Sequence, residues 1–121
     1  MRYEAKFLFD AVSLRLTRTP SRLLGEFSRE LRVSRRTIER AVIVASGKTF
    51  RKLREEILVE RVRSTFTTDP TRGIKELASR LGYKSPRSFA RAIRRACGSS
   101  PEELRSRIIR DVDAVENTVQ A

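Results

Sequence analysis

Histidine is absent from the 121-residue sequence, and cysteine occurs only once. Histidine is the commonest general base and metal ligand in proteins, and a lone cysteine without histidine has no base to activate it. A single cysteine also excludes an intramolecular disulfide, which fits a reducing cytoplasm. We therefore expect a cytoplasmic protein that is not an enzyme and has no cofactor and no metal site.

Long apolar runs are also missing. No stretch approaches the roughly twenty apolar residues of a membrane-spanning helix. The first ten residues carry charges inside their apolar stretch, unlike a signal peptide. The hydrophobic content of 39% can still support a core, in one moderate domain or two very small ones.

Acidic side chains are few, 15 against 27 lysines and arginines, so the formal net charge is +12. That excess opposes compaction and favours a polyanionic partner. Five of the basic residues are lysine and the rest are arginine, which makes the better forked contacts with phosphate and guanine. Nucleic acid is the first candidate partner, and an anionic membrane surface is the second.

The segment from Lys84 to Gly98 reads KSPRSFARAIRRACG and contains no acidic residue. Ser85 suits an N-cap, Pro86 suits the first helical position, and Gly98 suits a helix end. A short, capped, cationic helix fits the major groove of DNA, although a solvated basic helix would have the same composition. Its apolar residues share one face: Phe89, Ile93 and Ala96.

The pattern of helix, short turn and helix occurs twice, which is typical of a repeated helix-turn-helix. In the first helix of each copy, four positions recur at an offset of fifty: Leu24, Phe27, Ser28 and Leu31 match Ile74, Leu77, Ala78 and Leu81. In the second helix, five recur at an offset of fifty-one: Ser34, Ile38, Arg40, Val42 and Gly47 match Ser85, Phe89, Arg91, Ile93 and Gly98. The extra residue lies in the second turn, 82–84.

These patterns predict an all-α fold of about seven helices, with two helix-turn-helix subdomains joined by a long connecting helix. We expect the domain boundaries at 1–49, 50–66, 67–110 and 111–121. The expected helices before the second subdomain are 4–16, 22–31, 35–45 and 50–66. The connecting helix has two apolar rows and should pack on both sides: Phe50, Leu53 and Ile57, then Leu58, Val62 and Phe66.

The last helix should start at Ser100-Pro101-Glu102-Glu103, which has the form of a capping box. From Asp111 onward the chain contains three acidic residues and no basic residue. We expect this acidic tail to fray after about Val115 and to be solvated rather than to serve as an interaction motif.

The second copy carries a recognisable signature, Ile74-x-x-Leu77-Ala78-x-x-Leu81-Gly82-Tyr83-x-Ser85-x-x-x-Phe89-x-Arg91-x-Ile93, followed by Gly98-x-x-Pro101-x-x-Leu104-Arg105. It resembles the DNA-binding domain of AraC/XylS-type bacterial transcription regulators, and the resemblance spans about residues 5–110. It implies two recognition helices in successive major grooves, about 34 Å apart. It also implies a sequence-specific activator or repressor.

The chain departs from the pattern of that family at several places. Arg32 replaces the usual turn glycine, and Leu58 stands where arginine is usual. Ile93 and Cys97 stand where phenylalanine is common, so the second core would be looser or repacked. Arg87 replaces a frequent serine or glutamine, so the target sequence is not transferable from relatives. We expect Cys97 to be a small core residue.

The resemblance assigns base reading to residues that face outward from the two recognition helices. Arg40 and Arg91 are equivalent in the repeat and can each fork onto guanine, although each could instead brace its own subdomain. Glu39 could accept from cytosine or pair with Arg35 or Arg36. Ala90 could touch a thymine methyl group. The base-reading set is Arg36, Glu39, Arg40, Arg87, Ser88 and Arg91.

Phosphate contacts are expected from helix N-termini and nearby polar or basic side chains, which set register without reading sequence. The candidates are Ser34, Arg35, Thr37, Lys48, Thr49, Arg51, Ser85, Arg94, Arg95, Ser99 and Ser100.

The leading hypothesis is therefore a sequence-specific regulator that binds double-stranded DNA as a monomer and associates with the nucleoid, with RNA polymerase as a second candidate partner. A non-specific nucleic-acid binder, associated with the nucleoid or with RNA, is the alternative. A third hypothesis is an adaptor or membrane-surface protein. The sequence argues against it, because few basic residues accompany the apolar residues 7–9, which therefore make a poor basic amphipathic anchor. The sequence has no room for a sensor domain, so it is either a short stand-alone regulator or a fragment.

Overall fold

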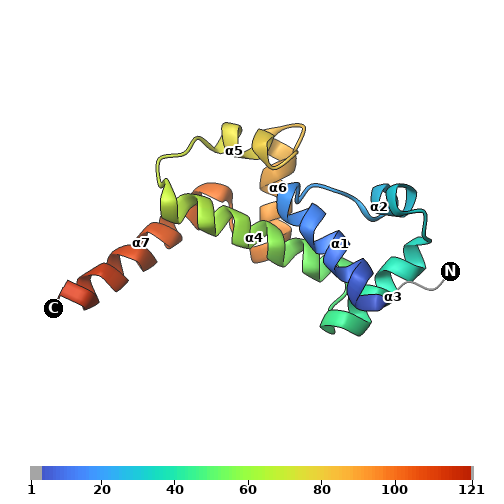
Figure 1. Ribbon diagram of the computed structural model, residues 1–121. Helices are drawn as coiled ribbons and strands as arrows, with labels where there is room; N and C mark the ends of the chain where they lie inside the picture. The colour runs from blue at the N-terminus through green and yellow to red at the C-terminus, as the bar shows by residue number, and fades with distance from the viewer. Residues whose placement is uncertain (1–3, 121) are drawn as a thin grey trace. The chain divides into compact units, whose positions relative to one another are not determined.

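The computed structural model describes residues 4–120, with side chains to 117, and these residues form seven helices and no strand (Figure 1). This confirms the predicted all-α fold. None of the helices in this range is long and apolar enough to cross a membrane. The helices are α1 (Ala5–Arg18), α2 (Leu24–Leu31), α3 (Arg35–Ser46), α4 (Phe50–Thr68), α5 (Ile74–Arg80), α6 (Pro86–Cys97) and α7 (Pro101–Gln120).

The ends of several helices differ from the sequence-based expectation: α1 ends at Arg18 rather than residue 16, and α4 ends at Thr68 rather than residue 66. Helix α2 begins at Leu24 rather than residue 22, because the Arg22 N–H bonds to the Thr19 carbonyl in a turn (3.1 Å) and Leu23 is extended. Helix α7 does not fray after Val115 but continues to Gln120. No glycine or proline interrupts the chain after Pro101, so nothing in the sequence stops that helix.

The chain forms two compact units, and the boundary between them falls inside α4, after Ile57. In the first unit, Phe27 and Phe50 meet edge to face with their ring centroids 6.0 Å apart. Such aromatic contacts add to the area that the rings bury. The buried core of this unit is Val12, Leu16, Phe27, Ile38, Val42, Phe50 and Leu53.

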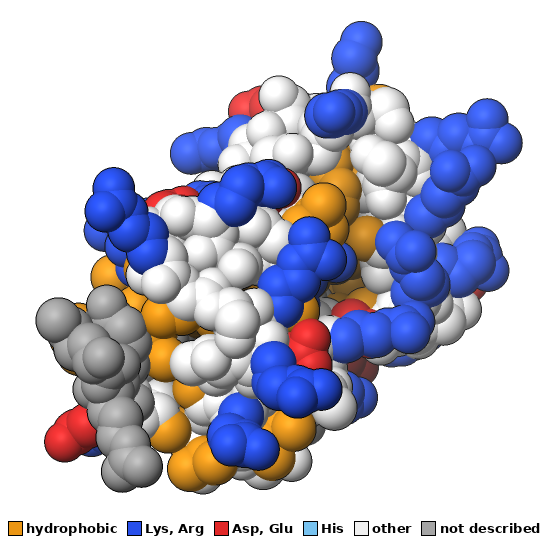
Figure 2. Space-filling model, turned by 90° about the vertical axis from the view of Figure 1, so that its right-hand side faces the viewer, with side chains coloured by type: hydrophobic (Ala, Val, Ile, Leu, Met, Phe, Trp, Pro, Cys, Tyr) orange, Lys and Arg blue, Asp and Glu red, His pale blue; other side chains and the backbone are white. Residues whose placement is uncertain are grey.

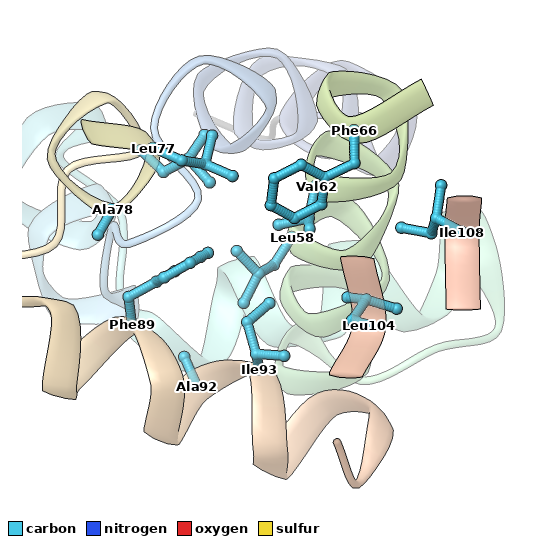
Figure 3. Close-up of a cluster of buried hydrophobic side chains, with 11 residues drawn as sticks. Leu58, Val62, Phe66, Leu77, Ala78, Phe89, Ala92, Ile93, Leu104 and Ile108 are labelled. Carbon is cyan, nitrogen blue, oxygen red and sulfur yellow. The ribbon is translucent and has the colours of Figure 1, made fainter. Parts of the chain in front are cut away.

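The second unit has its own core, to which α4, α5, α6 and α7 all contribute (Figure 3). Ile93 is fully buried there and Phe89 stacks at a tilt on Tyr83, 5.4 Å between centroids. The Cys97 thiol packs beside this core and donates to the Ile93 carbonyl (3.3 Å). Ile93 is thus part of this core, and Cys97 lies at its edge. The core is Leu58, Val62, Phe66, Leu77, Ala78, Leu81, Phe89, Ala92, Ile93, Leu104 and Ile108.

Helix α4 belongs to both units, and each of its two apolar rows packs into a different core. Its second row repeats the buried row of α1 at an offset of fifty: Leu58, Val62 and Phe66 match Leu8, Val12 and Leu16. Its first row is repeated in α7 at an offset of fifty-one: Phe50, Leu53 and Ile57 match Pro101, Leu104 and Ile108. The repeat therefore comprises four helices, and α4 closes the first copy while it opens the second.

Equivalent arginines of the two copies donate to carbonyls of equivalent loops. Arg54 donates to the carbonyls of Pro20 and Ser21 (3.1 and 2.9 Å), and Arg105 donates to the carbonyl of Arg72 (3.0 Å). In each unit an arginine of the fourth helix thus holds the loop that precedes the helix-turn-helix. Bonds to otherwise orphaned carbonyls fix such a loop in place.

Ion pairs also recur, with one exchange of charge. Arg22 pairs with Glu26 at 2.9 Å, and Arg72 pairs with Glu76 at the same distance. Glu30 additionally accepts from Arg22 and from Arg15, and these two hydrogen bonds hold the pKa of Glu30 below the usual glutamate range. The second unit has a basic residue, Arg80, at the position of Glu30. The ion pair between Arg15 of α1 and Glu30 of α2 therefore has no equivalent among the described residues of the second unit, where the acidic partner is replaced by an arginine.

The turn of the first helix-turn-helix contains an arginine in a left-handed conformation. Arg32 has φ 56° and is the only non-glycine residue with positive φ between residues 4 and 120; Gly82 holds the equivalent place at φ 92°. The backbone bonds around both turns match, because Val33 bonds to the Ser28 carbonyl (3.2 Å) as Tyr83 bonds to that of Ala78 (3.0 Å). The first turn thus keeps its geometry without the glycine that favours it.

Replacing Arg32 with glycine should raise the free energy of unfolding by up to about 1 kcal/mol, because glycine adopts left-handed φ without the Cβ clash. Urea denaturation at an unchanged m-value measures the gain. Arg32→Ala is the matched control, because it removes the charge and keeps the Cβ. An equal gain in both variants would trace the effect to charge repulsion instead of the backbone.

Candidate nucleic-acid interface

Helix α3 is held at both ends by its own sequence. The Ser34 hydroxyl oxygen accepts from the Thr37 N–H (3.1 Å), and Gly47 ends the helix at φ 73°. Its inner face buries three apolar residues, as expected: Ile38, Ala41 and Val42. The opposite face is thereby turned to solvent.

Three charged residues stand on that outer face: Arg36, Glu39 and Arg40, all exposed. Among the residues that the structure describes, none of the three takes part in an ion pair or side-chain hydrogen bond. The pairing of Glu39 with Arg35 or Arg36 is therefore not formed, and Arg40 makes no ion pair or side-chain hydrogen bond to another described residue. Their charges are open to an external partner.

Helix α6 has a stronger N-terminal cap. The Ser85 hydroxyl oxygen accepts from the Ser88 N–H (3.1 Å), and the Ser88 hydroxyl oxygen accepts from the Ser85 N–H (3.3 Å). The Ser88 hydroxyl also lies 2.9 Å from the Ser85 carbonyl, to which it can donate. The sequence predicted Ser88 as a base reader, and the structure places its hydroxyl within this cap.

Arg87 and Arg91 are exposed on α6, at the places that Arg36 and Arg40 take on α3. Neither makes an ion pair within the described part of the chain. Further along, Arg94 lies 3.9 Å from the carboxylate of Glu103, and both side chains are 63% exposed. An exposed pair at that distance contributes little and can reopen.

The surface shown in Figure 2 carries many lysine and arginine side chains, with few acids and with apolar side chains visible between them. A cationic surface of this kind attracts phosphates over a range set by ionic strength.

All of the expected phosphate-contacting residues of the first unit are exposed, and some of them already bond to other groups of the chain. Thr49 caps α4 through the Lys52 N–H (3.1 Å), and Lys48 pairs with Glu56 at 2.5 Å. That pair lowers the pKa of Glu56 through the hydrogen bond from Lys48. Arg51 pairs with Glu55 at 3.3 Å and is 76% exposed. The remaining members, Ser34, Arg35 and Thr37, are exposed at the start of α3.

Arg35 packs closely on the first turn of α2. A Cβ built on Gly25 would lie 2.7 Å from the Arg35 Nη2 atom. The guanidinium therefore lies next to the free N–H groups at that helix end, and both favour an anion. The glycine lets the two approach each other.

The second unit keeps most, but not all, of the corresponding candidates. Ser85 caps α6, Ser100 caps α7 through the Glu103 N–H (3.1 Å), and Arg95 is exposed. Ser99, however, is only 3% exposed, and its hydroxyl accepts from Arg107 at 2.5 Å. The Ser99 hydroxyl is therefore not accessible to a phosphate, contrary to the sequence-based prediction.

Two exposed residues near the end of α3 were missed by the sequence analysis. Ile43 is 51% exposed and Val44 is 69% exposed. An apolar residue in an amphipathic helix is normally assigned to the core, so composition gives no signal for either. Ile43 and Val44 follow Arg40 by three and four residues, about one helical turn, and this spacing is the sequence signal that could have indicated their exposure.

A family model described as "Helix-turn-helix domain" matches residues 27–107, more than half of the chain. The C-terminal domain of AraT, a response regulator from Geobacillus stearothermophilus, has a similar fold with a TM-score of 0.69 at 22% identity, covering 87% of this chain and 85% of that one. A DNA-binding transcriptional dual regulator from Escherichia coli K-12 is similar with a TM-score of 0.60 at 18% identity, covering 91% and 96%. No curated protein sequence matches the chain.

Proposed function

Because the chain belongs to the AraC-type helix-turn-helix domains, we propose that it reads a specific sequence of double-stranded DNA. Members of that family are DNA-binding regulators of transcription and are not enzymes. We propose further that α3 and α6 enter successive major grooves. The observation that supports this is that both recognition helices carry exposed arginines at equivalent positions, and that these arginines form no ion pair among the described residues. A single non-specific cationic surface does not require such a repeat.

In this proposal Arg40 and Arg91 each read a guanine. A guanidinium can donate two parallel hydrogen bonds to the O6 and N7 atoms of that base, and no other base pair presents the same acceptors in the major groove. Arg36 and Arg87 lie one turn nearer the helix N-terminus and would read the neighbouring step. Glu39 would accept from a cytosine amino group, which adds discrimination against other bases.

Phosphate contacts would fix the register of each unit on the duplex. The capped N-termini of α3 and α6 offer N–H groups to phosphates, and Arg35 adds charge at the start of α3. Arg51 in the first turn of α4 and Arg95 in the last turn of α6 supply further charge. Such contacts release counterions, so binding should weaken as salt concentration rises. They carry no sequence information by themselves.

We propose that the chain binds as a monomer, because it holds two recognition helices of its own. As a regulator it would act at the chromosome, and RNA polymerase is the partner that activation would require. The net charge of +12 also supports the alternative, a basic protein that binds nucleic acid without sequence preference. Salt dependence is common to both functions and does not separate them.

Selection of binding sites from random duplex DNA separates them. We expect a motif in two parts, centred about 10 base pairs apart, that binds roughly 10³-fold or more tightly than scrambled DNA at one fixed salt concentration. A motif in one part would mean that only one recognition helix reads bases. Tight binding without enrichment would establish the non-specific function.

A further inference from the structure

We propose that Ile43 recognises the 5-methyl group of a thymine in the half-site read by α3. This inference rests on the proposed function and adds to it a residue that determines specificity. Thymine is the only base that presents an apolar group in the major groove, and apolar side chains discriminate it by contact with that methyl.

The position of Ile43 on the helix supports this role. Ile43 follows Arg36 by seven residues, Glu39 by four and Arg40 by three, so all four side chains lie on one side of α3. We call these four residues the α3 strip. The recognition helix of homeodomains contacts the major groove with residues at the same four relative positions. A helix that reads bases with Arg36, Glu39 and Arg40 therefore brings Ile43 to the groove as well.

The surroundings of Ile43 also point to DNA. It lines a hollow of about 340 Å³ together with the rest of the α3 strip and Val44. On its other side it lines a second hollow of about 260 Å³, whose other lining residues are apolar, polar and charged: Leu24, Phe50, Thr49, Glu39 and Arg51. Ile43 thus lies between charged groups suited to bases and polar groups suited to phosphate, where a duplex would cover it.

The comparison of the two units shows that an apolar residue is not required by the fold here. The equivalent residue of α6 is Arg94, which is also exposed. Ile43 leaves half of its surface in water in the free protein, so that apolar surface is still available to be buried. Burial against a methyl group would gain the hydrophobic free energy that the free protein lacks. The two recognition helices would then differ in what their last turns read.

Val44 provides a matched control. It is β-branched and even more exposed, yet it lies about 100° further round the helix. Val44 borders the same hollow of about 340 Å³ as Ile43, but unlike Ile43 it also lines a hollow with Ala5 and Leu8, on the side of α3 that faces α1. Val44→Ala therefore removes the same kind of surface from a place outside the α3 strip.

The test replaces each thymine of the selected site, in turn, by deoxyuridine, which lacks only the 5-methyl group. For the wild-type chain we expect one such replacement to weaken binding about fourfold, the value of one buried methyl group. Ile43→Ala should lose a similar factor on the thymine site and show no further loss on the uracil site. Val44→Ala should keep the wild-type response to that replacement.

Circular dichroism melting checks the fold, and we expect both variants to match the wild type because both residues are exposed. An Ile43→Ala chain that is as sensitive to the uracil as the wild type would overturn the inference. Strong site selectivity without sensitivity to any uracil would also overturn it, while the proposed function would stand. If the wild type selected no site at all, the proposed function itself would fail.

Discussion

Replacing Arg91 with alanine should weaken binding to the best DNA site by about 1–3 kcal/mol and relax the preference for one base pair. The exposed guanidinium makes no ion pair among the described residues, so the loss would report its contact with guanine and not a change in the fold. Arg40→Ala should have the same effect on a different base pair, in the other half of the site. Equilibrium titration against the selected site and its single-base variants measures both.

Arg95→Ala is the matched control for this prediction. Arg95 is also an exposed arginine of α6 without an ion pair among the described residues, but it lies beyond the base-facing positions. Its loss should weaken binding about equally on all sequences and lower the slope of log affinity against log salt by about 1. If Arg91→Ala behaved in the same way, Arg91 would be a phosphate contact.

Replacing Phe89 with alanine should destabilise the second unit by about 3–5 kcal/mol, because the side chain is fully buried among residues of the same core. We expect the amides of α5 and α6 to lose protection from hydrogen exchange. Those of α2 and α3 should keep theirs, since the first unit has a separate core. The selected DNA motif should shrink to the half read by α3.

Phe7→Ala is the control for Phe89→Ala, since it removes the same ring from a site that is 64% exposed. It should change the free energy of unfolding by less than about 0.5 kcal/mol. Loss of protection over α2 and α3 as well as α5 and α6 in the Phe89 variant would show that the two units unfold as one. The shared helix α4 is the element through which such coupling would pass.

Local signals explain why so much of the fold was predictable from the sequence. Ser34, Ser85, Gly47 and Gly98 act through bonds within three or four residues, and the structure forms each cap and each left-handed end. The apolar rows of α4 were visible as two faces, and both are buried in cores. Because the helix-turn-helix pattern occurs twice in the sequence, its two copies also indicated the family.

Other features depend on contacts that no local pattern encodes. The match between α4 and α1 lies in Leu58, Val62 and Phe66, whose neighbours in sequence differ from those of the first copy, so α4 looked like a mere connector. The hydrogen bonds of the Ser88 hydroxyl with the Ser85 backbone, which complete the N-terminal cap of α6, depend on the rotamer of Ser88. The exposure of Ile43 depends on which helices cover α3, and the burial of Ser99 depends on Arg107.

The sharing of α4 has a consequence for how far this architecture can propagate. A repeat whose last helix doubles as the first helix of the next could in principle continue as an open array, provided that each closing helix carries a second apolar row. In α7 the positions that match Leu58, Val62 and Phe66 hold Ile109, Asp113 and Asn117. Two of the three are polar and exposed, so α7, unlike α4, lacks the second apolar row against which a further copy would have to pack.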